Sequence, residues 1–573
     1  MLRMDKNMDR ITQQYRLWLE KADKDHELLQ ELKSMEDSPP KIQDAFYQEL
    51  TFGTGGLRGI IGAGTNRMNI YTVAKASQGL AHYIKAHWNE TSIGIAKTPK
   101  VAVSYDSRIN SALFAQITCR VLAANNIQAW LYPQLMPTPC LSYAVRELGC
   151  AAGVMITASH NPAVYNGYKV YGSDGCQITS LAAKEILEEI KQADMFLSVP
   201  DLSFEEGVGN GSICYIPDSI YASYIQAVKE QSLTGYGDRH ISIVYSPLNG
   251  TGLKPVLRTL SESGYDHVMV VEEQRMPDGN FPTCPYPNPE VWEAMDLGVQ
   301  YAKHCRADLV LATDPDCDRV GIAVKDKAGE YVLLSGNETG MLLLDYICSR
   351  RFSDGTMPKD PVFMKTIVTA NMAERIAAHY GVRTLNVLTG FKYIGEQLGI
   401  LEAEGRENSF VFAFEESYGY LSGTYVRDKD GVVASLLICE MAAVCLSQGL
   451  SLLDKLEELY RTYGYCMDTQ HCYSFEGAQG ASQMQKIMKE FRTVPDSLGG
   501  KKVLNFLDYQ DGIDGLPKSN VVRFLLDGHC SVVIRPSGTE PKMKVYVSVL
   551  AKGRKEAAEI ERRISGDIEA FIF

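Results

Sequence analysis

Short apolar runs alternate with amphipathic segments along most of the chain. Near-continuous apolar runs predict strands at residues 101–105, 153–156, 240–245 and 307–313, and each of these runs leads into a polar loop. Buried strands that alternate with helices are typical of mixed or parallel sheets covered on both faces. The pattern therefore predicts an α/β chain in which polar loops follow buried strands.

The N-terminal stretch, to about residue 49, is polar and helical in pattern. Leucines recur there at helical spacing, and we expect them to pack against the rest of the chain. These positions are Leu17, Leu28, Leu29 and Leu32.

Toward the C-terminus the pattern becomes that of a separate α+β domain. Residues 521–526, an Asp-Gly turn and residues 531–534 predict a hairpin. A third strand is expected at 543–550, followed by a helix with one apolar face. The stretch 463–497 is expected to hold the linker into this domain.

The composition is that of an ordinary soluble protein. The 573 residues include 45% hydrophobic and 22% charged residues, which suggests three to five domains. The first residues, Met-Leu-Arg-Met-Asp-Lys, show no signal-peptide pattern, and Glu440 interrupts the most apolar segment, 431–453. We expect that segment to be a buried helix rather than a membrane span.

The cysteine pattern indicates the redox environment of the protein, and the net charge limits the classes of partner that it can bind. The 14 cysteines contain no Cys-x-x-Cys pair, which predicts a reduced, cytoplasmic protein. A net charge of −13 argues against nucleic acid or an anionic membrane as a partner. A small anionic substrate remains compatible, provided that basic groups gather locally. No obligate protein partner is evident.

A Thr-Ala-Ser-His-Asn-Pro sequence at 157–162 follows one predicted strand and presents Ser159 on a loop. An ordinary polar turn is the alternative interpretation. Ser159 and His160 are adjacent, so this pair is not by itself a Ser–His dyad. The chain contains no G-x-S-x-G elbow.

An Asp-Pro-Asp-Cys-Asp-Arg sequence follows another predicted strand. Its carboxylates, at Asp314, Asp316 and Asp318, can converge on a hard divalent cation, and without a cation or base they would repel one another. An EF-hand is excluded because Arg319 stands at the sixth position and Lys325 at the twelfth. A solvated acidic turn is the alternative.

Three further segments have residues suited to phosphate or sugar. Residues 535–542 offer an arginine, hydroxyls and a glycine, which together suit an anion nest. The glycine-rich loop 52–59 matches neither nucleotide-binding pattern. The paired glutamates and serine of 414–419, followed by 427–431, suit hydrogen bonding to sugar hydroxyls, although a helix start would look similar.

Together these segments resemble the α-D-phosphohexomutase family, in the same order and over nearly the whole chain. Residues 157–162 resemble its phosphoserine loop, 314–319 its metal loop and 535–539 its phosphate loop. Residues 389–392 and 414–419 resemble the loops of its third domain, the latter contacting the sugar. The combination of phosphoserine, metal and phosphate loops is highly specific.

The resemblance implies an α/β fold of four domains around a central cleft, with three related mixed α/β domains and a smaller C-terminal α+β domain. The expected boundaries are 1–207 for the N-terminal helices and phosphoserine domain, and 208–328 for the metal-binding domain. The sugar-binding domain is expected at 329–457 and the phosphate-binding domain at 458–573.

The resemblance also implies roles for individual residues. Ser159 should carry a phosphate and, with the three aspartates, ligate Mg²⁺. Lys169 and Lys429 are alternatives for proton transfer, and His160 is expected to shape the loop rather than act as a base. The catalytic residues implied are Ser159, Arg58, His160, Lys169 and Lys429. The substrate-binding residues implied are Arg319, Thr389, Gly390, Lys392, Glu415, Ser417, Arg427, Arg535, Ser537, Gly538 and Thr539.

The implied activity is transfer of a phosphoryl group between the 1- and 6-positions of glucose. Glucose 1,6-bisphosphate would be both the intermediate and the activator. The Glu-Glu-Ser sequence is similar to that of phosphoglucomutases, and the long helical lead to the branch that includes phosphopentomutases. Phosphopentomutase, phosphomannomutase, a phosphatase and a non-catalytic phosphosugar-binding protein are the alternatives. Phe414 stands where the family usually has Gly, and Asn249 where it often has His.

Overall fold

The structure is a computed structural model. It describes residues 2–52, 56–88, 98–196, 199–200, 202–233, 239–475, 477–513, 515–536 and 542–573. The chain divides into two units, which are described separately below. The first unit contains residues 1–232, 240–321 and 424–436, and the second contains 233–239, 322–423 and 437–573.

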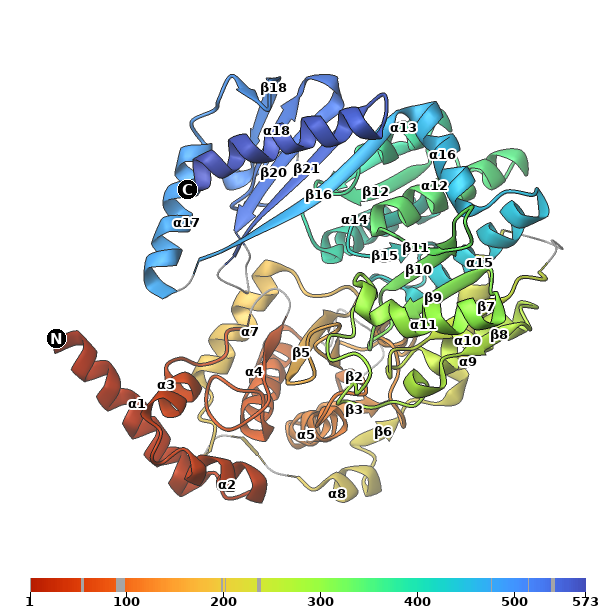
Figure 1. Cartoon of the computed structure of the whole chain (residues 1–573). Helices are drawn as coiled ribbons and strands as arrows, with labels where there is room; N and C mark the ends of the chain where they lie inside the picture. The colour runs from red at the N-terminus through yellow and green to blue at the C-terminus, as the bar shows by residue number, and fades with distance from the viewer. Residues whose placement is uncertain are drawn as a thin grey trace. The chain divides into compact units, whose positions relative to one another are not determined.

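A mixed six-stranded sheet forms the centre of the first unit (Figure 1). Its strand order is β1-β5-β4-β2-β3-β6. β2 runs parallel to β3 and β4, whereas β5 runs antiparallel to β4 and β1. The strands are β1 (Leu57–Ile60), β2 (Lys100–Tyr105), β3 (Gln128–Leu131), β4 (Ala152–Ile156), β5 (Tyr165–Gly172) and β6 (Ile213–Tyr215). The predicted strands at 101–105 and 153–156 are confirmed.

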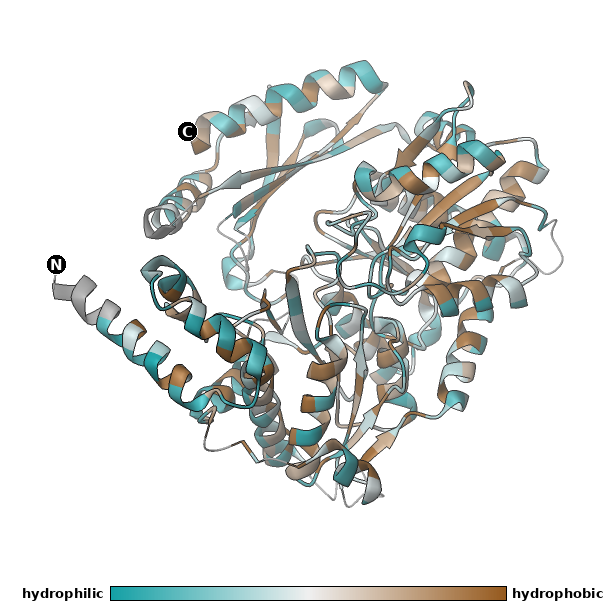
Figure 2. Cartoon of the chain, turned by 60° about the horizontal axis from the view of Figure 1, so that its bottom comes forward, coloured by the Kyte–Doolittle hydropathy of each residue, from teal (hydrophilic) through white to brown (hydrophobic). Residues whose placement is uncertain are grey.

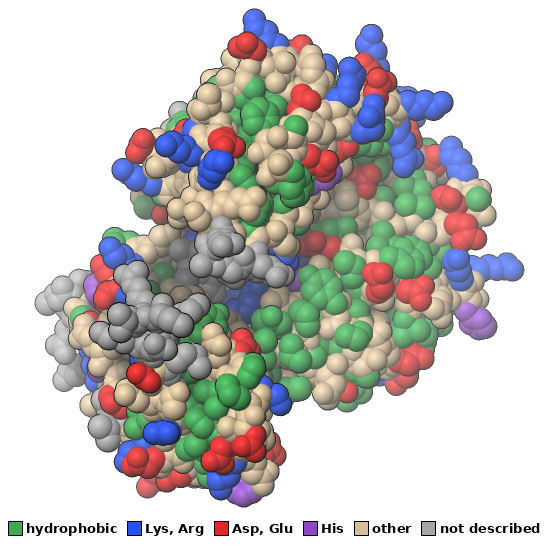
Figure 3. All heavy atoms as spheres, turned by 60° about the vertical axis from the view of Figure 1, so that its left-hand side comes forward, with side chains coloured by type: hydrophobic (Ala, Val, Ile, Leu, Met, Phe, Trp, Pro, Cys, Tyr) green, Lys and Arg blue, Asp and Glu red, His purple; other side chains and the backbone are tan. Residues whose placement is uncertain are grey.

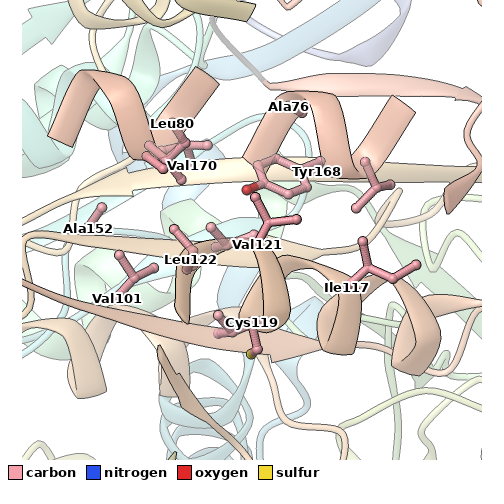
Figure 4. Packing of buried hydrophobic residues seen from close by; sticks show 14 of the residues in the cluster. Ala76, Leu80, Val101, Ile117, Cys119, Val121, Leu122, Ala152, Tyr168 and Val170 are labelled. Carbon is pink, nitrogen blue, oxygen red and sulfur yellow. The ribbon is translucent and has the colours of Figure 1, made fainter. Parts of the chain in front are cut away.

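Helices cover both faces of this sheet. On one face, strand residues such as Val170 pack with Leu80 of α4 and Leu122 of α5 (Figure 4). On the other face, an added Cβ at Gly153 would lie 2.5 Å from Val145 of α6, so that helix packs directly on the strand. These helices are α4 (Ile70–His87), α5 (Ser111–Ala124), α6 (Thr138–Glu147) and α7 (Ser180–Gln192).

Three N-terminal helices pack on this domain through one aromatic-rich cluster. They are α1 (Leu2–Lys21), α2 (His26–Ser34) and α3 (Pro39–Phe46). Leu28 and Leu32 are buried as predicted, and Leu29 is partly exposed. The prediction for Leu17 is wrong, because its side chain is 39% exposed. The neighbouring Trp18 is buried instead and lies on the helix face that contacts the core.

A second sheet of the first unit contains three parallel strands in the order β9-β7-β8. They are β7 (Ile243–Ser246), β8 (Val268–Val270) and β9 (Leu309–Thr313). The predicted strands near 240–245 and 307–313 are therefore present. The remaining helices of the unit are α8 (Phe204–Gly209), α9 (Asp218–Lys229), α10 (Leu253–Glu262) and α11 (Trp292–Cys305). The boundary between the units falls within β10 (Val320–Lys325), which forms a hairpin with β11 (Tyr331–Leu334).

The second unit contains a four-stranded sheet in the order β13-β12-β14-β15. Its strands are β12 (Val362–Thr366), β13 (Arg383–Val387), β14 (Phe410–Glu415) and β15 (Gly419–Leu421). The accompanying helices are α12 (Gly336–Ser353), α13 (Met372–His379), α14 (Phe391–Ala403) and α16 (Leu452–Tyr463). The predicted buried helix at 431–453 is α15 (Gly431–Ser447), which ends before the expected limit and whose first residues belong to the first unit.

Among the described residues, no single helix has the length and apolar character needed to cross a membrane. The pair α15 and α16 passes that test only when the two are joined, and they are bent by 87° at the break.

An antiparallel C-terminal sheet completes the second unit, with the order β16-β21-β20-β19-β18-β17. The predicted hairpin and third strand are confirmed as β19, β20 and β21. The strands are β16 (Tyr465–Ser474), β17 (Ser497–Leu498), β18 (Lys501–Asp508), β19 (Val522–Leu526), β20 (Cys530–Pro536) and β21 (Lys542–Ala551). The helices α17 (Gly477–Phe491) and α18 (Arg554–Ile572) pack on one face of it, and hydrophobic and hydrophilic residues alternate along α18 (Figure 2).

The expected linker at 463–497 is wrong, because this stretch forms β16 and α17. β16 lies at the edge of the sheet and carries polar residues along its length. Thr469 and His471 contact Glu561 of α18 at 2.9 and 2.8 Å. The strand thus packs partly through polar contacts, which leave no apolar alternation in the sequence.

Candidate active site

Ser159 lies on a tight loop at the carboxyl end of β4. Its φ of +53° falls in the left-handed region, which is uncommon for residues other than glycine. Its backbone N–H donates to Thr157 Oγ1 at 2.8 Å, and its side chain is buried. The surrounding structure therefore holds this serine in a demanding conformation.

Asp106 and Arg108 hold this loop from the neighbouring strand. β2 and β4 are parallel, so their carboxyl ends meet at one edge, where Asp106 accepts a hydrogen bond from Thr157 at 2.6 Å. The Arg108 guanidinium donates to the carbonyls of Ser159, Asn161 and Pro162. Sequence reasoning missed both residues, although their Asp-Ser-Arg segment directly follows a predicted strand.

The predicted metal loop follows β9 and lies against Ser159. The Ser159 hydroxyl donates to Asp314 Oδ2 at 2.7 Å. Asp314, Asp316 and Asp318 are all buried, and one carboxylate oxygen from each lies within 4.8 Å of the others. The structure therefore brings together the serine and the three aspartates that the sequence singled out.

The chemistry of this cluster fits a divalent cation. Asp316 Oδ1 is buried and has no hydrogen-bond partner among the described residues. Burial and the neighbouring carboxylates of Asp316 and Asp318 raise the pKa of Asp314 well above its ordinary value. Burial and Asp316 likewise raise the pKa of Asp318. Buried carboxylates in such mutual repulsion are suited to an oxygen-preferring cation such as Mg²⁺.

Two lysines contact the same cluster, one from earlier in the sequence than the metal loop and one from later. Lys169 Nζ on β5 lies 2.8 Å from Asp316 Oδ2, and Lys429 Nζ lies 3.2 Å from Asp318 Oδ2. Burial opposes ionisation of Asp316, but Lys169 and Lys429 hold its pKa below its ordinary value. Thr138 also donates to Asp316, at 3.0 Å, and was not singled out from the sequence.

The remaining groups around Ser159 are His160, Arg58 and Arg319. His160 Nδ1 lies 3.3 Å from Ser159 Oγ, and burial and Arg319 lower the pKa of the imidazole well below its ordinary value. Arg58 on β1 donates to Asn161 at 3.3 Å, and Arg319 pairs with Glu290 at 3.1 Å. A neutral imidazole is consistent with the expected loop-shaping role of His160.

Basic groups are thus gathered locally in a chain whose net charge is −13. Acidic and basic side chains are mixed on the face of the molecule shown in Figure 3.

Arg427, expected to bind substrate, is buried, and its guanidinium donates to the carbonyls of Thr424 and Val426. A role for Arg427 in substrate binding stays a prediction.

In the second unit, Glu415 ends β14 and Ser417 lies in the turn that leads to β15. The neighbouring Glu416 accepts hydrogen bonds from Thr366 and Thr369, at 3.3 and 3.4 Å. Phe414 is fully buried, and its ring packs where a side chain at Gly340 of α12 would otherwise lie. Successive strand residues face opposite sides, so Phe414 points away from the face of Glu415.

Thr389, Gly390 and Lys392 lie at the start of α14. Gly390 has φ +118°, a value that favours glycine, and directly precedes the first helical residue. The Thr389 hydroxyl oxygen is buried without a hydrogen-bond partner among the described residues. Thr389 and Gly390 directly precede this helix N-terminus and Lys392 lies in its first turn, a position that suits an anionic or hydroxyl ligand.

Arg535, on β20, donates to the Tyr546 hydroxyl at 3.4 Å. Burial and Glu416 raise the pKa of Tyr546 to about 12, which keeps this hydroxyl protonated near neutral pH. Arg535, Tyr546 and Glu416 therefore lie in one neighbourhood of the second unit. The expected phosphate-binding residues Ser537, Gly538 and Thr539 lie outside the described residues.

Comparisons with known proteins agree with this arrangement. Models described as phosphoglucomutase/phosphomannomutase, alpha/beta/alpha domains I, II and III, match residues 49–196, 222–329 and 335–463. Phosphoglucomutase of Staphylococcus aureus strain MSSA476 is 36% identical over 562 residues, covering 95% of this chain and 97% of that protein. The corresponding protein of strain N315 is 36% identical over 552 residues, covering 93% and 95%.

Solved structures of the same family share the fold. A putative phosphomannomutase from Thermus thermophilus gives a TM-score of 0.66 at 20% identity, covering 91% of this chain and 99% of that one. Pp63/parafusin (phosphoglucomutase) from Paramecium gives 0.66 at 18% identity, covering 92% and 95%. With a serine beside an aspartate cluster and domain models that match most of its length, the chain belongs to the phosphoglucomutase/phosphomannomutase family.

Proposed function

We propose that this chain is a phosphoglucomutase that interconverts glucose 1-phosphate and glucose 6-phosphate. The observation that carries the proposal is the Ser159 hydroxyl, 2.7 Å from Asp314 within a buried cluster of three aspartates. Its relatives at 36% identity over 95% of the chain, named phosphoglucomutases, support glucose as the sugar. The family description also names phosphomannomutase, so mannose phosphates form the comparison.

Ser159 carries the phosphoryl group in this proposal. A hydroxyl oxygen of the sugar attacks phosphorus, the bond from phosphorus to Ser159 Oγ breaks, and its electron pair stays on Oγ. The hydroxyl proton passes to Lys169 or Lys429, acting in the neutral amine form, and the side-chain nitrogens of both lysines lie at the aspartate cluster. Mg²⁺, which Asp314, Asp316 and Asp318 would hold together with Ser159, supplies positive charge to offset that of the phosphoryl oxygens.

The same chemistry then runs in reverse from the other end of the sugar. Glucose 1,6-bisphosphate is the intermediate of the proposed cycle, and added bisphosphate activates the enzyme by phosphorylating Ser159. Arg58 and Arg319 offset charge near the transferring group. Because phosphoryl transfer depends mainly on positioning and electrostatics, the rigid support of Ser159 by Arg108 is consistent with this role.

The second unit supplies substrate contacts in this proposal. Glu415 and Ser417 bind sugar hydroxyls, and Thr389, Gly390 and Lys392 add polar contacts at the start of α14. Arg535, with Ser537, Gly538 and Thr539, binds the phosphate that does not react. A guanidinium suits this task because it offers paired donors to phosphate oxygens.

The test is a product assay on purified protein with glucose 1-phosphate and a trace of glucose 1,6-bisphosphate. Glucose 6-phosphate should accumulate with little inorganic phosphate, and peptide analysis should place a phosphate on the peptide that contains Ser159. Stoichiometric phosphate release would identify a phosphatase. A higher kcat/KM for mannose 1-phosphate than for glucose 1-phosphate would identify a phosphomannomutase.

A further inference from the structure

The Tyr171 side chain is buried close to the aspartate cluster, and the proposed reaction does not use its hydroxyl group. It lies two residues after Lys169 on β5, so both side chains stand on the same face of the sheet. The Tyr171 side chain is 0% exposed, and a buried phenol oxygen requires a hydrogen-bond partner. That partner is Asp428, from the segment 424–436 of the same unit.

A continuous set of contacts joins Tyr171 to the metal loop. The Tyr171 hydroxyl donates to Asp428 Oδ2 at 2.9 Å. Lys429 Nζ donates to Asp428 Oδ1 at 3.0 Å and lies 3.2 Å from Asp318 Oδ2. All four side chains are buried, so little solvent screens these interactions.

We propose that Tyr171 and Asp428 are positioning residues that hold the ammonium group of Lys429 at the Asp318 end of the aspartate cluster. This inference rests on the proposed function, in which Lys429 is one of two candidates for proton transfer. These contacts fix the position of the Lys429 side chain. Tyr171 therefore influences the reaction without contacting the substrate.

The hydrogen bond from Tyr171 determines how the Asp428 carboxylate is oriented. Asp428 Oδ1 accepts from both the backbone N–H of Lys429, at 2.8 Å, and its ammonium. Tyr171 binds the other oxygen and prevents rotation of the carboxylate about its terminal bond. A lysine side chain has several rotatable bonds, so fixing its anion also fixes the position of Nζ.

The charge states agree with this arrangement. Burial and the Asp428 carboxylate raise the pKa of Tyr171 well above its ordinary value, so the phenol remains a donor under assay conditions. Burial opposes ionisation of Asp428, but the ammonium groups of Lys429 and Lys169 hold its pKa below its ordinary value.

Tyr224 provides a matched control in the same unit. Its hydroxyl donates to Asp430 at 2.9 Å, so it also is a buried tyrosine that binds a buried carboxylate. Asp430, however, binds the first N–H groups of α15, at Val432 and Val433, and has a helix-capping role. Tyr224→Phe therefore removes a similar hydrogen bond, but from the carboxylate that caps α15 rather than from the one that binds Lys429.

The experiment is a double-mutant cycle on the full chain with glucose 1-phosphate. Tyr171→Phe should lower kcat by about 3- to 10-fold, the effect of one lost hydrogen bond, and change KM less than twofold. In an Asp428→Ala or Lys429→Met background, Tyr171→Phe should have no further effect on kcat. Tyr224→Phe should change kcat by the same factor in each background, whatever that factor is.

Equal effects of Tyr171→Phe in all backgrounds, or an unchanged kcat in the single variant, would overturn the inference. Thermal unfolding of each variant identifies any loss of folded protein. A wild-type chain without mutase activity would instead refute the proposed function. A normal kcat for Lys429→Met would show that Lys169 transfers the proton and would also remove the basis for this positioning role.

Discussion

The Ser159 hydroxyl donates a hydrogen bond to Asp314 across 155 positions of the chain. The contact joins the loop after β4 of one sheet to the loop after β9 of another within the first unit. A phosphate carried on Ser159 would therefore lie at the aspartate cluster, where a cation can offset its charge. This relationship makes the serine and the metal loop parts of one site and leads to the first two predictions.

Ser159→Ala should abolish turnover while leaving the fold intact. Removing an attacking or carrier group costs enzymes about three orders of magnitude or more in kcat. The Ser159 side chain supports the loop less than Arg108 does, so the melting temperature should change little. Ser77→Ala, which removes a fully buried hydroxyl of α4 that donates to the Val73 carbonyl, is the control and should keep its activity. Turnover of the Ser159 variant near the wild-type value would refute the carrier role.

Removing divalent cations should abolish activity, and Mg²⁺ should restore it. Cation binding should also raise the melting temperature, because it relieves repulsion among Asp314, Asp316 and Asp318. A ligand at a hundred times its Kd stabilises the folded state by about 2.7 kcal/mol. Asp316→Asn should reduce this thermal shift as well as activity. Full activity after exhaustive chelation would contradict the assignment of this cluster as the metal site.

Glu374→Gln should destabilise the second unit at neutral pH. The Lys365 ammonium is fully buried and lies 3.0 Å from Glu374, whose side chain is 39% exposed. Leaving a buried charge without its counter-ion costs about 3–5 kcal/mol, and solvent screening of Glu374 reduces the expected loss to about 1–3 kcal/mol. Denaturant unfolding of both proteins at pH 7 measures the difference.

This difference should shrink in acid. Burial opposes ionisation of Glu374, but Lys365 and the hydrogen bonds from Lys365 and Asn386 hold its pKa below its ordinary value of 4.5. A depressed carboxyl pKa contributes stability that is present above the ordinary value and is lost as the pH falls through the folded-state value. Glu404→Gln, which breaks a half-exposed pair with Arg406, should have little effect at any pH. A difference that grows toward pH 4 would contradict the pairing.

Arg535→Ala should weaken binding of the substrate more than it slows the chemistry. A charge-assisted contact to phosphate is worth about 1.5–3 kcal/mol, so the apparent KM should rise about ten- to a hundredfold. Some loss of kcat is expected, because remote binding energy also positions the reacting end. Arg563→Ala on α18, which removes an exposed arginine, should change neither constant. Unchanged kinetics for Arg535→Ala would show that Arg535 does not bind the substrate phosphate.

Much of the fold was predictable because its central strands are buried on both faces. β2, β4 and β9 therefore appear in the sequence as unbroken apolar runs bounded by polar loops. The edge strand β16 has no such run, because Thr469 and His471 pack through polar contacts. An error of one position within α1 placed Leu17 rather than Trp18 in the core, because more than one register of a 3.6-residue repeat fits this mainly polar helix.

The candidate site was predictable where one segment carries its chemistry. Asp314, Asp316 and Asp318 occur within five positions, and a local pattern suffices to identify them. Arg108 and Asp428 act through contacts with residues distant in sequence, such as Arg108 with the Ser159 carbonyl. Contacts between residues that are distant in sequence leave no short sequence motif, so these supporting residues are identified only in the folded structure.

The last prediction concerns the sugar, and the Phe414 side chain bears directly on it. A bulky residue at a position where the family usually has Gly could have moved Glu415 or blocked the sugar. Phe414 is instead fully buried and packs with Phe363 and Phe412 beneath α12, where Gly340 leaves room for the ring. Glu415 is therefore expected to keep the family's contact with the hydroxyls at C3 and C4.

Glucose 1-phosphate should accordingly have the highest kcat/KM in a panel of sugar 1-phosphates. Mannose differs from glucose only at C2, so a site that recognises C3 and C4 should accept mannose 1-phosphate more slowly but measurably. Galactose is inverted at C4 and should lose about 1.5–3 kcal/mol, the worth of one hydrogen bond to a carboxylate such as Glu415. Ribose 1-phosphate presents hydroxyls of a five-membered ring in other directions and should be the poorest substrate. Glu415→Gln should reduce the preference for glucose over galactose, whereas a higher kcat/KM for ribose 1-phosphate than for glucose 1-phosphate would make this chain a phosphopentomutase.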